Sequence, residues 1–140
     1  MQKIVLDTNI LVSSLIQKNY SYFIVNELVI EKRIHLCVSD QLMEEYYLVL
    51  KRKKFSIYPD FLNKAETLLA QIETISDLYF PKIKLNIIRD FDDNKLLELA
   101  FECKANFLIT GNSNDFTMAK FGKTKVVTPR EYWEKYHPFK

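Results

Sequence analysis

The stretch KIVLDTNILVSSLI, residues 3–16, places an aspartate directly behind an apolar run. Ile4, Val5 and Leu6 predict a buried strand, and Asp7 follows them before the apolar residues resume. A buried carboxylate is costly unless a partner offsets its charge. Asp7 is therefore either a turn residue at the surface or one member of a charged site that the rest of the chain completes.

The composition is that of a globular chain with room for one domain. The 140 residues are 48% hydrophobic, include only 2 glycines and 4 prolines, and carry a formal net charge of +2. This length supports one hydrophobic core, so we expect a single domain over residues 1–140. The nearly balanced charge does not predict a strong polyanion binder, so a basic surface for a nucleic acid would have to be local.

The cysteines and the apolar segments indicate a cytoplasmic protein. Cys37 and Cys103 lie in no CxxC or Cys/His pattern, so we expect no structural zinc site and interpret both as core residues of a reduced protein. Residues 10–16 are apolar but too short to span a membrane, and Asp7 precedes them. We therefore expect a cytoplasmic protein without a membrane segment.

Predicted strands and helices alternate along the chain, which favours an α/β fold with a parallel sheet. We expect strands at residues 3–6, 35–38, 77–80, 106–110 and 125–127. We expect helices at residues 10–17, 21–32, 40–53, 59–75 and 92–104, and a last helix that starts at Pro129. Ser39 is the expected N-cap of the helix over 40–53, and Thr128 and Glu131 form an expected capping box.

Acidic residues follow the predicted strands. Asp7 ends the first strand, and Glu45 lies on the second turn of the helix after the second strand. The remaining members are at the start of the 92–104 helix and behind the fourth strand: Asp90, Asp92, Asp93, Asn112 and Asp115. The carboxyl ends of parallel strands meet at one edge of a sheet, where open α/β sheets bind ligands. We therefore expect these side chains to lie close together.

Carboxylates that are brought together repel one another, and the usual remedy is a hard divalent cation held by oxygen ligands. A ligand set without histidine or cysteine favours Mg²⁺ or Mn²⁺ over zinc or copper. Such ions suit phosphate substrates, on which they activate a water molecule for in-line attack. The chain has no Walker-type GxxxxGK[ST] motif, which argues against NTP hydrolysis of that class. With a nucleic-acid backbone as the phosphate substrate, the reaction would be hydrolysis of a phosphodiester.

Four segments, in order, resemble the PIN-domain (PilT N-terminus) ribonuclease family and, within it, the VapC-type toxins of toxin–antitoxin modules. They are VLDTNILVSSL (5–15), SDQLMEEYYLVL (39–50), RDFDDNKLLELA (89–100) and LITGNSNDF (108–116). The resemblance covers essentially the whole chain. It implies a three-layer α/β/α fold with a four- to five-stranded parallel sheet, and a Mg²⁺- or Mn²⁺-dependent endoribonuclease. It also implies an RNA substrate, a cognate antitoxin protein and a homodimer.

The resemblance assigns roles residue by residue. The positions that would hold the metal and carry catalysis are Asp7, Glu45, Asp93 and Asp115. Thr8 and Asn9 would hold the Asp7 loop by hydrogen bonds. The other supporting positions are Asp90, Asp92 and Asn112.

Asn112 departs from the family pattern, because many members carry an aspartate there. An amide oxygen can still face a metal or its water, but it adds no negative charge. The sequence therefore leaves open whether the site binds one metal ion or two. The alternative function is a catalytically weakened PIN domain that binds RNA or protein.

Two other classes of protein fit the sequence less well. A phosphatase with an aspartate nucleophile usually has a second aspartate where this chain has Asn9, and a phospho-receiver domain would need an acidic pair near Asp7, which stands alone.

Three groups also have a structural interpretation. Glu44 neighbours Glu45, and the helical register does not choose between them, although the family spacing favours Glu45. An acid at the start of the 92–104 helix can cap it, and we expect one to do so while Asp93 binds the metal. The basic run 51–54 is either a solvated helix end or a contact for RNA or an antitoxin.

Overall fold

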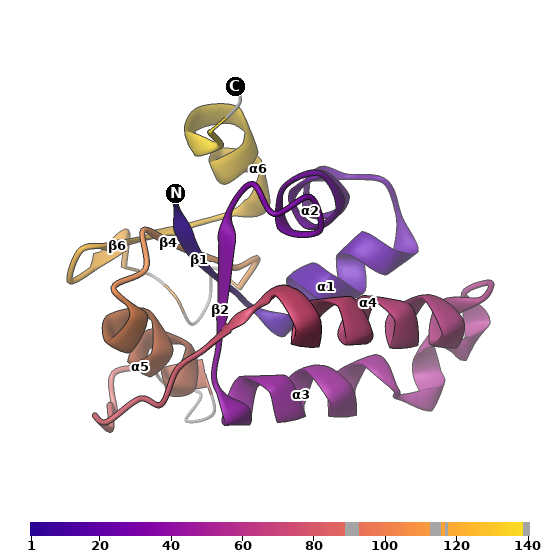
Figure 1. The fold of residues 1–140 in the computed structure, drawn as a ribbon, viewed down its shortest axis with the longest axis horizontal. Coiled ribbons are helices and arrows are strands. Elements are labelled where there is room, and N and C mark those ends of the chain that lie inside the picture. Colours follow the sequence, from indigo (N-terminus) through magenta and orange to yellow (C-terminus); the bar gives the residue numbers. More distant parts are fainter. Residues whose placement is uncertain (89–92, 113–115, 117, 139–140) are drawn as a thin grey trace.

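A computed structural model describes residues 1–88, 93–112, 116 and 118–138. Within these ranges the strands form one sheet in the order β3-β2-β1-β4-β6-β5 (Figure 1). The strands are β1 (Lys3–Leu6), β2 (His35–Val38), β3 (Asp77–Leu78), β4 (Phe107–Ile109), β5 (Lys120–Phe121) and β6 (Thr124–Val127). All neighbours pair in parallel except β5, which runs antiparallel to β6. The expected parallel α/β sheet is confirmed, and β5 adds an edge strand that the sequence analysis did not predict.

The parallel register brings the ends of the central strands to one level. Leu6 of β1 lies opposite Ile109 of β4, and Ile109 lies opposite Val127 of β6. The backbone N–H of Asp7 then donates to the carbonyl of Ile109 at 3.0 Å, and that of Thr110 donates to the carbonyl of Val127 at 2.9 Å. The sheet therefore places Asp7 and Thr110 side by side at its carboxyl edge.

The helices cover both sides of this sheet (Figure 1). They are α1 (Thr8–Ile16), α2 (Tyr20–Phe23), η1 (Ile24–Val29), α3 (Asp40–Leu50), η2 (Lys53–Ile57), α4 (Phe61–Ile75), α5 (Asn94–Cys103), α6 (Pro129–Glu131) and η4 (Tyr132–Tyr136). Helix α5 packs across β1, β2 and β4, while α1 and α2 lie on the other side of the strands, and α3 and α4 run side by side. This arrangement is the three-layer α/β/α architecture that the resemblance implies.

Both predicted capping motifs are confirmed. The Ser39 hydroxyl accepts a hydrogen bond of 3.1 Å from the backbone N–H of Leu42, so α3 starts directly behind β2. The Thr128 hydroxyl accepts from the N–H of Glu131, and the Glu131 carboxylate accepts from the N–H of Thr128, both at 3.1 Å. These caps satisfy backbone donors that the first helical turn leaves without a partner.

The starts of α1 and α4 differ from the prediction. Helix α1 begins at Thr8, so Asp7 is the residue that joins β1 directly to a helix. Helix α4 begins at Phe61, and Pro59 lies outside it because Asp60 takes a left-handed conformation with φ of 58°. Proline favours a first helical turn, but this local turn decides where the helix begins.

The basic run 51–54 lies beyond the end of α3. The helix ends at Leu50 and not at residue 53, and the chain continues through Arg52 in an extended conformation into η2. These side chains are exposed. The interpretation of the run as a solvated segment behind the helix agrees with this placement, although the helix is shorter than expected.

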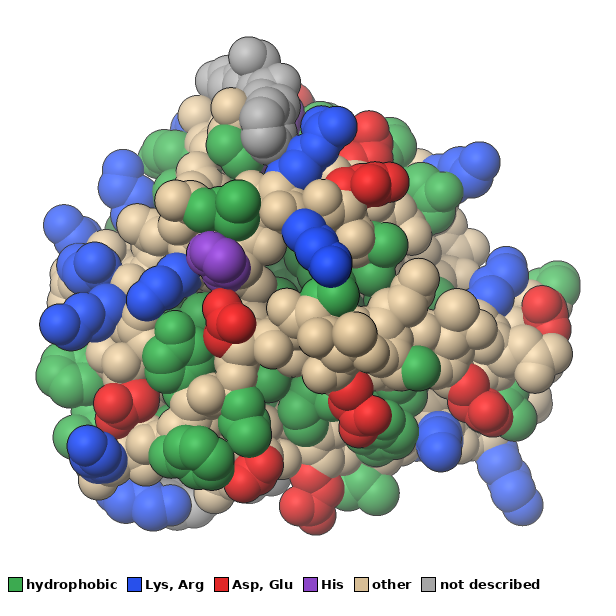
Figure 2. Space-filling model, in the orientation of Figure 1, with side chains coloured by type: hydrophobic (Ala, Val, Ile, Leu, Met, Phe, Trp, Pro, Cys, Tyr) green, Lys and Arg blue, Asp and Glu red, His purple; other side chains and the backbone are tan. Residues whose placement is uncertain are grey.

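A short hairpin joins β5 to β6. Gly122, with φ of 58°, makes the tight turn, and Lys120 lies opposite Lys125 across the two strands. The Nζ atom of Lys125 lies 4.7 Å from the centroid of the Tyr136 ring. Figure 2 shows Lys and Arg side chains gathered on this side of the molecule. A local basic surface therefore exists on this side. The hairpin turn lies at the start of β6, whereas Asp7 lies level with the end of β6, so the hairpin turn and Asp7 lie at opposite ends of that strand.

The core surrounds the central strands. Ile4, Val5 and Leu6 are completely buried, as expected for a strand covered on both faces. Cys37 and Cys103 are buried free thiols, in agreement with their interpretation as core residues. None of the described helices is long and apolar enough to cross a membrane.

Candidate functional site

Asp7 is a buried carboxyl group at the carboxyl edge of the sheet, with 5% of its surface exposed. Its Oδ2 atom accepts a hydrogen bond of 2.7 Å from the Thr110 hydroxyl, and the backbones of Asn9 and Thr8 also bond to the carboxylate. Burial raises the pKa of Asp7 above its ordinary value of 3.8; the Thr110 bond opposes this, and the charge of Glu45 adds to it. The ionised carboxylate is thus in a place that favours a nearby cation.

Thr110 connects Asp7 to the chain behind β4. Its hydroxyl donates to Asp7 and accepts a hydrogen bond of 3.0 Å from the backbone N–H of Asn112. Thr110 is 4% exposed, so water does not take over either bond. The sequence analysis did not select this residue. A hydroxyl residue that ends the strand next to β1 is the signal that would have found it.

Glu45 is held by donors from two other helices. The Thr8 hydroxyl at the start of α1 donates to Oε2, and Nζ of Lys95 in α5 lies 2.6 Å from Oε1. The neighbouring Tyr46 is completely buried, and its hydroxyl donates to the carbonyl of Leu6 at 2.6 Å. This bond fixes α3 against the end of β1, and so it presents Glu45 to the region of Asp7.

The structure distinguishes Glu45 from Glu44. Glu44 is exposed on α3, whereas Glu45 is partly buried and its charge acts on the pKa of Asp7. The geometry therefore favours Glu45 as the acid that acts together with Asp7, as the family spacing predicts.

Asp93 approaches the same edge from the start of α5. Its Oδ2 atom accepts a hydrogen bond of 3.4 Å from Nδ2 of Asn112. Although Asp93 occupies the N-cap position of α5, its side chain makes no capping hydrogen bond. Contacts therefore run from Asp7 through Thr110 and Asn112 to Asp93, which brings the first, third and fourth sequence segments together.

Two further polar residues of α5 hold the chain that leads to the site. Oδ1 of Asn94 accepts hydrogen bonds of 2.9 Å from the backbone N–H groups of Ile87 and Ile88. Oε2 of Glu98 accepts one of 2.8 Å from the N–H of Leu85. Both side chains are buried, so these bonds satisfy side-chain oxygens that are shielded from water. The sequence analysis selected neither residue, because a polar residue on an apolar helix face gives no local signal of its partner.

The remaining predicted positions are placed only in part. Asp90, Asp92 and Asp115 lie outside the described residues. Asn9 is exposed and supports Asp7 through its backbone. Thr8 supports Asp7 in the same way, but its hydroxyl bonds to Glu45.

The donors that meet at this edge suit a hard divalent cation, because Asp7, Glu45 and Asp93 offer carboxylate oxygens. Among the residues that the structure describes, however, no three His, Cys, Asp or Glu side chains gather closely enough to hold a metal ion. The four-residue ligand set stays a prediction, and Asp115 is the member outside the described ranges.

A groove of about 740 Å³ opens beside Glu45. Helix α3, residues 84–86 and helix α5 form its walls. The walls carry the basic residues Arg52, Lys84 and Lys95 as well as acidic ones, Glu44 and Glu98 among them. A charged, extended ligand could therefore reach Glu45 along α3.

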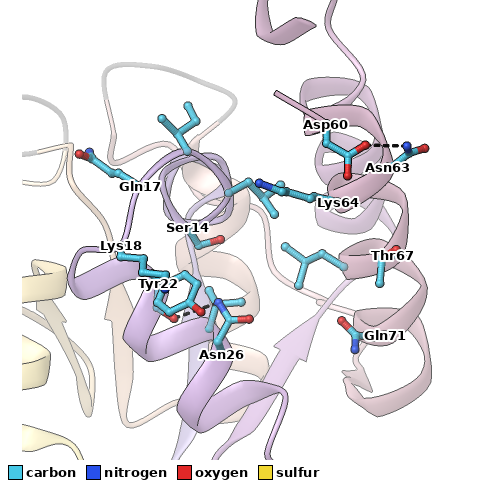
Figure 3. Close-up of a pocket in the computed structure, with 14 residues that line it drawn as sticks. Ser14, Gln17, Lys18, Tyr22, Asn26, Asp60, Asn63, Lys64, Thr67 and Gln71 are labelled. Atoms are coloured by element: carbon cyan, nitrogen blue, oxygen red, sulfur yellow. Dashed lines mark hydrogen bonds between the residues drawn. The ribbon is translucent and has the colours of Figure 1, made fainter. Parts of the chain in front are cut away.

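A second pocket, of about 600 Å³, lies between α1, α2 and α4 (Figure 3). Lys64 reaches from α4 toward α1, and Oδ1 of Asp60 accepts a hydrogen bond of 2.7 Å from Nδ2 of Asn63. None of the predicted site residues lines this pocket. The acidic edge and this pocket are thus separate features.

Comparisons with known proteins point to one fold. The sequence pattern of the PIN domain family matches residues 3–114. The Uncharacterized protein MJ1680 of Methanocaldococcus jannaschii is 29% identical over 145 residues, which cover 98% of this chain and 93% of that protein. The crystal structure of VapBC2 from Rickettsia felis bound to a DNA fragment from their promoter matches with a TM-score of 0.57 and 20% identity. The match covers 90% of this chain and 98% of the other, and at this identity it shows a shared fold.

Proposed function

This chain belongs to the PIN domain family, and on that premise we propose that it is an endoribonuclease that depends on Mg²⁺ or Mn²⁺. The observation that carries the proposal is the buried carboxylate of Asp7, which lies near the charge of Glu45. Burial and like charge make ionised Asp7 unfavourable in the absence of a cation. An isolated structural aspartate would more often occur at the surface.

The ligands of the proposed ion are Asp7, Glu45, Asp93 and Asp115. A divalent cation bound there would stabilise the charge that develops on the phosphate and make a water molecule more acidic. The chain itself orients these acids: Thr110 holds Asp7, Thr8 holds Glu45, and Asn112 holds Asp93. Preorganised carboxylates need no rearrangement when charge develops, which is the usual source of electrostatic catalysis.

We further propose that the chain is the toxin of a toxin–antitoxin module, with a cognate antitoxin, a homodimeric state and a cytoplasmic location. The four sequence segments support a VapC-like assignment, and the fold shared with VapBC2 is consistent with it. We also retain the proposal of one domain over residues 1–140.

A second candidate is a PIN domain that binds RNA or protein without cleavage. Asn112 favours it, because the Asn112 amide bonds to Asp93 and adds no charge where many family members carry an acid. The presence of Asp7, Glu45 and Asp93 favours the enzyme.

Cleavage of a labelled single-stranded RNA by the purified protein tests the proposal, with Mg²⁺, with Mn²⁺ and with EDTA. Asp7→Asn and Glu45→Gln should abolish cleavage, whereas Glu44→Gln is the matched control on the adjacent, exposed position. Metal-dependent cleavage by the wild type and by Glu44→Gln, but not by Asp7→Asn or Glu45→Gln, would establish the nuclease. RNA binding without cleavage or metal binding would favour the second candidate.

A further inference from the structure

Lys95 is a cation within the acidic site whose position its own helix does not explain. It lies in the first turn of α5, where the helix dipole disfavours a positive charge. Its Nζ atom is 2.6 Å from Oε1 of Glu45, and the two side chains are 14% and 27% exposed. An ion pair that is partly shielded from water is one interaction that offsets the unfavourable dipole.

Glu45 has both carboxylate oxygens engaged. Oε1 pairs with Lys95, and Oε2 accepts a hydrogen bond from Thr8. A divalent cation that approaches Glu45 would therefore meet a positive charge already next to the carboxylate. Two cations at one carboxylate repel each other, so the ion binds Glu45 more tightly when the ammonium group moves away.

The surroundings of Lys95 allow this movement. Lys95 lines the groove of about 740 Å³ that opens beside Glu45. A lysine carries its charge on a flexible four-carbon stem, so the ammonium group can move without a change in α5.

We propose that Lys95 is an internal counter-cation, which neutralises Glu45 in the ion-free protein and competes with the divalent cation for that carboxylate. The inference rests on the proposed metal-dependent function. It gives Lys95 two effects that oppose each other: it stabilises the ion-free fold by reducing the repulsion between Glu45 and Asp7, and it weakens binding of the ion.

The test measures Mn²⁺ binding by calorimetry, and thermal unfolding in EDTA and in Mn²⁺, for the wild type and for Lys95→Met, Lys95→Arg and Lys84→Met. Lys95→Met keeps the apolar stem and removes the charge, whereas Lys95→Arg keeps the charge. Lys84→Met removes a charge from the same groove, so it controls for the general effect of a lost cation.

We expect Lys95→Met to bind Mn²⁺ roughly three- to fivefold more tightly, the range that corresponds to one partly exposed ion pair. It should melt at a lower temperature than the wild type in EDTA and gain more from Mn²⁺. Lys95→Arg and Lys84→Met should bind Mn²⁺ like the wild type.

Unchanged or weaker Mn²⁺ binding by Lys95→Met, with normal binding by the wild type, would overturn the inference and leave the proposed function intact. An equal gain in Lys84→Met would also overturn it, because the effect would then be the charge of the groove. Absence of Mn²⁺ binding in every protein would overturn the proposed metal dependence and the inference together.

Discussion

The Thr110 hydroxyl lies 2.7 Å from Oδ2 of Asp7 and joins the carboxyl ends of two neighbouring parallel strands through side chains. The same hydroxyl accepts a hydrogen bond from the backbone N–H of Asn112. One oxygen atom thus links the buried acid to the segment behind β4. Thr110, to which the sequence analysis assigned no role, therefore supports the candidate site through these two hydrogen bonds.

Replacement of Thr110 by valine should destabilise the protein and reduce cleavage. Valine keeps the shape but leaves the Asp7 carboxylate and the Asn112 N–H without this partner, which costs about 1–3 kcal/mol for a buried polar group. Urea unfolding measures the free energy, and Thr110→Ser is the control because it retains the hydroxyl. Unchanged stability of Thr110→Val would show that the two hydrogen bonds of the hydroxyl do not stabilise the fold.

Asp7→Asn should remove cleavage and stabilise the ion-free protein at neutral pH. The folded pKa of Asp7 is raised above 3.8, so the folded state holds the proton more tightly than the unfolded state. The associated stability is complete below pH 3.8 and is lost as the pH rises through the raised pKa. The asparagine variant lacks this loss and still accepts the Thr110 bond.

Urea unfolding in EDTA between pH 3 and 8 measures this difference. The stability of the asparagine variant relative to the wild type should increase with pH over the range above 3.8 and then stay constant. A difference that is constant at every pH would mean that Asp7 titrates in the folded protein as it does in the unfolded chain.

Mg²⁺ or Mn²⁺ should raise the melting temperature of the wild type and leave Asp7→Asn almost unchanged. A ligand that binds only the folded state at 100 times its Kd adds about 2.7 kcal/mol of stability. Differential scanning calorimetry with added Mn²⁺ or with EDTA measures the change, and Ca²⁺ tests whether the smaller ions are preferred. A similar increase in both proteins would place the ion elsewhere.

Tyr46→Phe should lower stability by about 1 kcal/mol, because it removes the buried hydrogen bond to the Leu6 carbonyl. The aromatic ring still fills the core between α3 and β1. Unfolding gives the free energy, and RNA cleavage shows whether this bond also positions Glu45. Full activity at reduced stability would mean that packing of the ring alone presents Glu45.

The two thiols should not react with a thiol reagent in the folded protein. The interaction with Cys103, followed by burial, raises the pKa of the Cys37 thiol, and both side chains are 1% exposed or less. Ellman's reagent should therefore detect no thiol in the native protein and both after unfolding in guanidinium. A rapid native reaction would contradict the buried placement.

The sequence predicted the parts of the site that follow from the ends of buried strands. Asp7 follows β1 directly, and Asn112 lies three residues after the end of β4, so a parallel sheet is enough to bring them to one edge. The position of Glu45 could be predicted because Ser39 caps α3 immediately behind β2, which places the second turn of α3 near the same edge. These relationships are local, and the sequence contains them.

The missed features depend on tertiary contacts. Thr110 gains its role from the neighbouring strand, and Lys95 gains its role from α3, so neither is apparent in a single segment. The predicted start of α4 was wrong because the left-handed conformation of Asp60 outweighs the preference of proline for a first helical turn. Strand β5 was missed because two residues are too few to form a recognisable pattern.

The hairpin that ends the sheet also affects how the protein behaves at high concentration. Lys120 and Lys125 face each other across β5 and β6, and the edge strand is only two residues long. A strand from another molecule that tried to extend the sheet there would find few backbone groups to pair with and a second set of lysines beside its own. Like charges and a short edge are features that protect sheets against strand-to-strand aggregation, so they disfavour growth of fibrils from this side of the sheet.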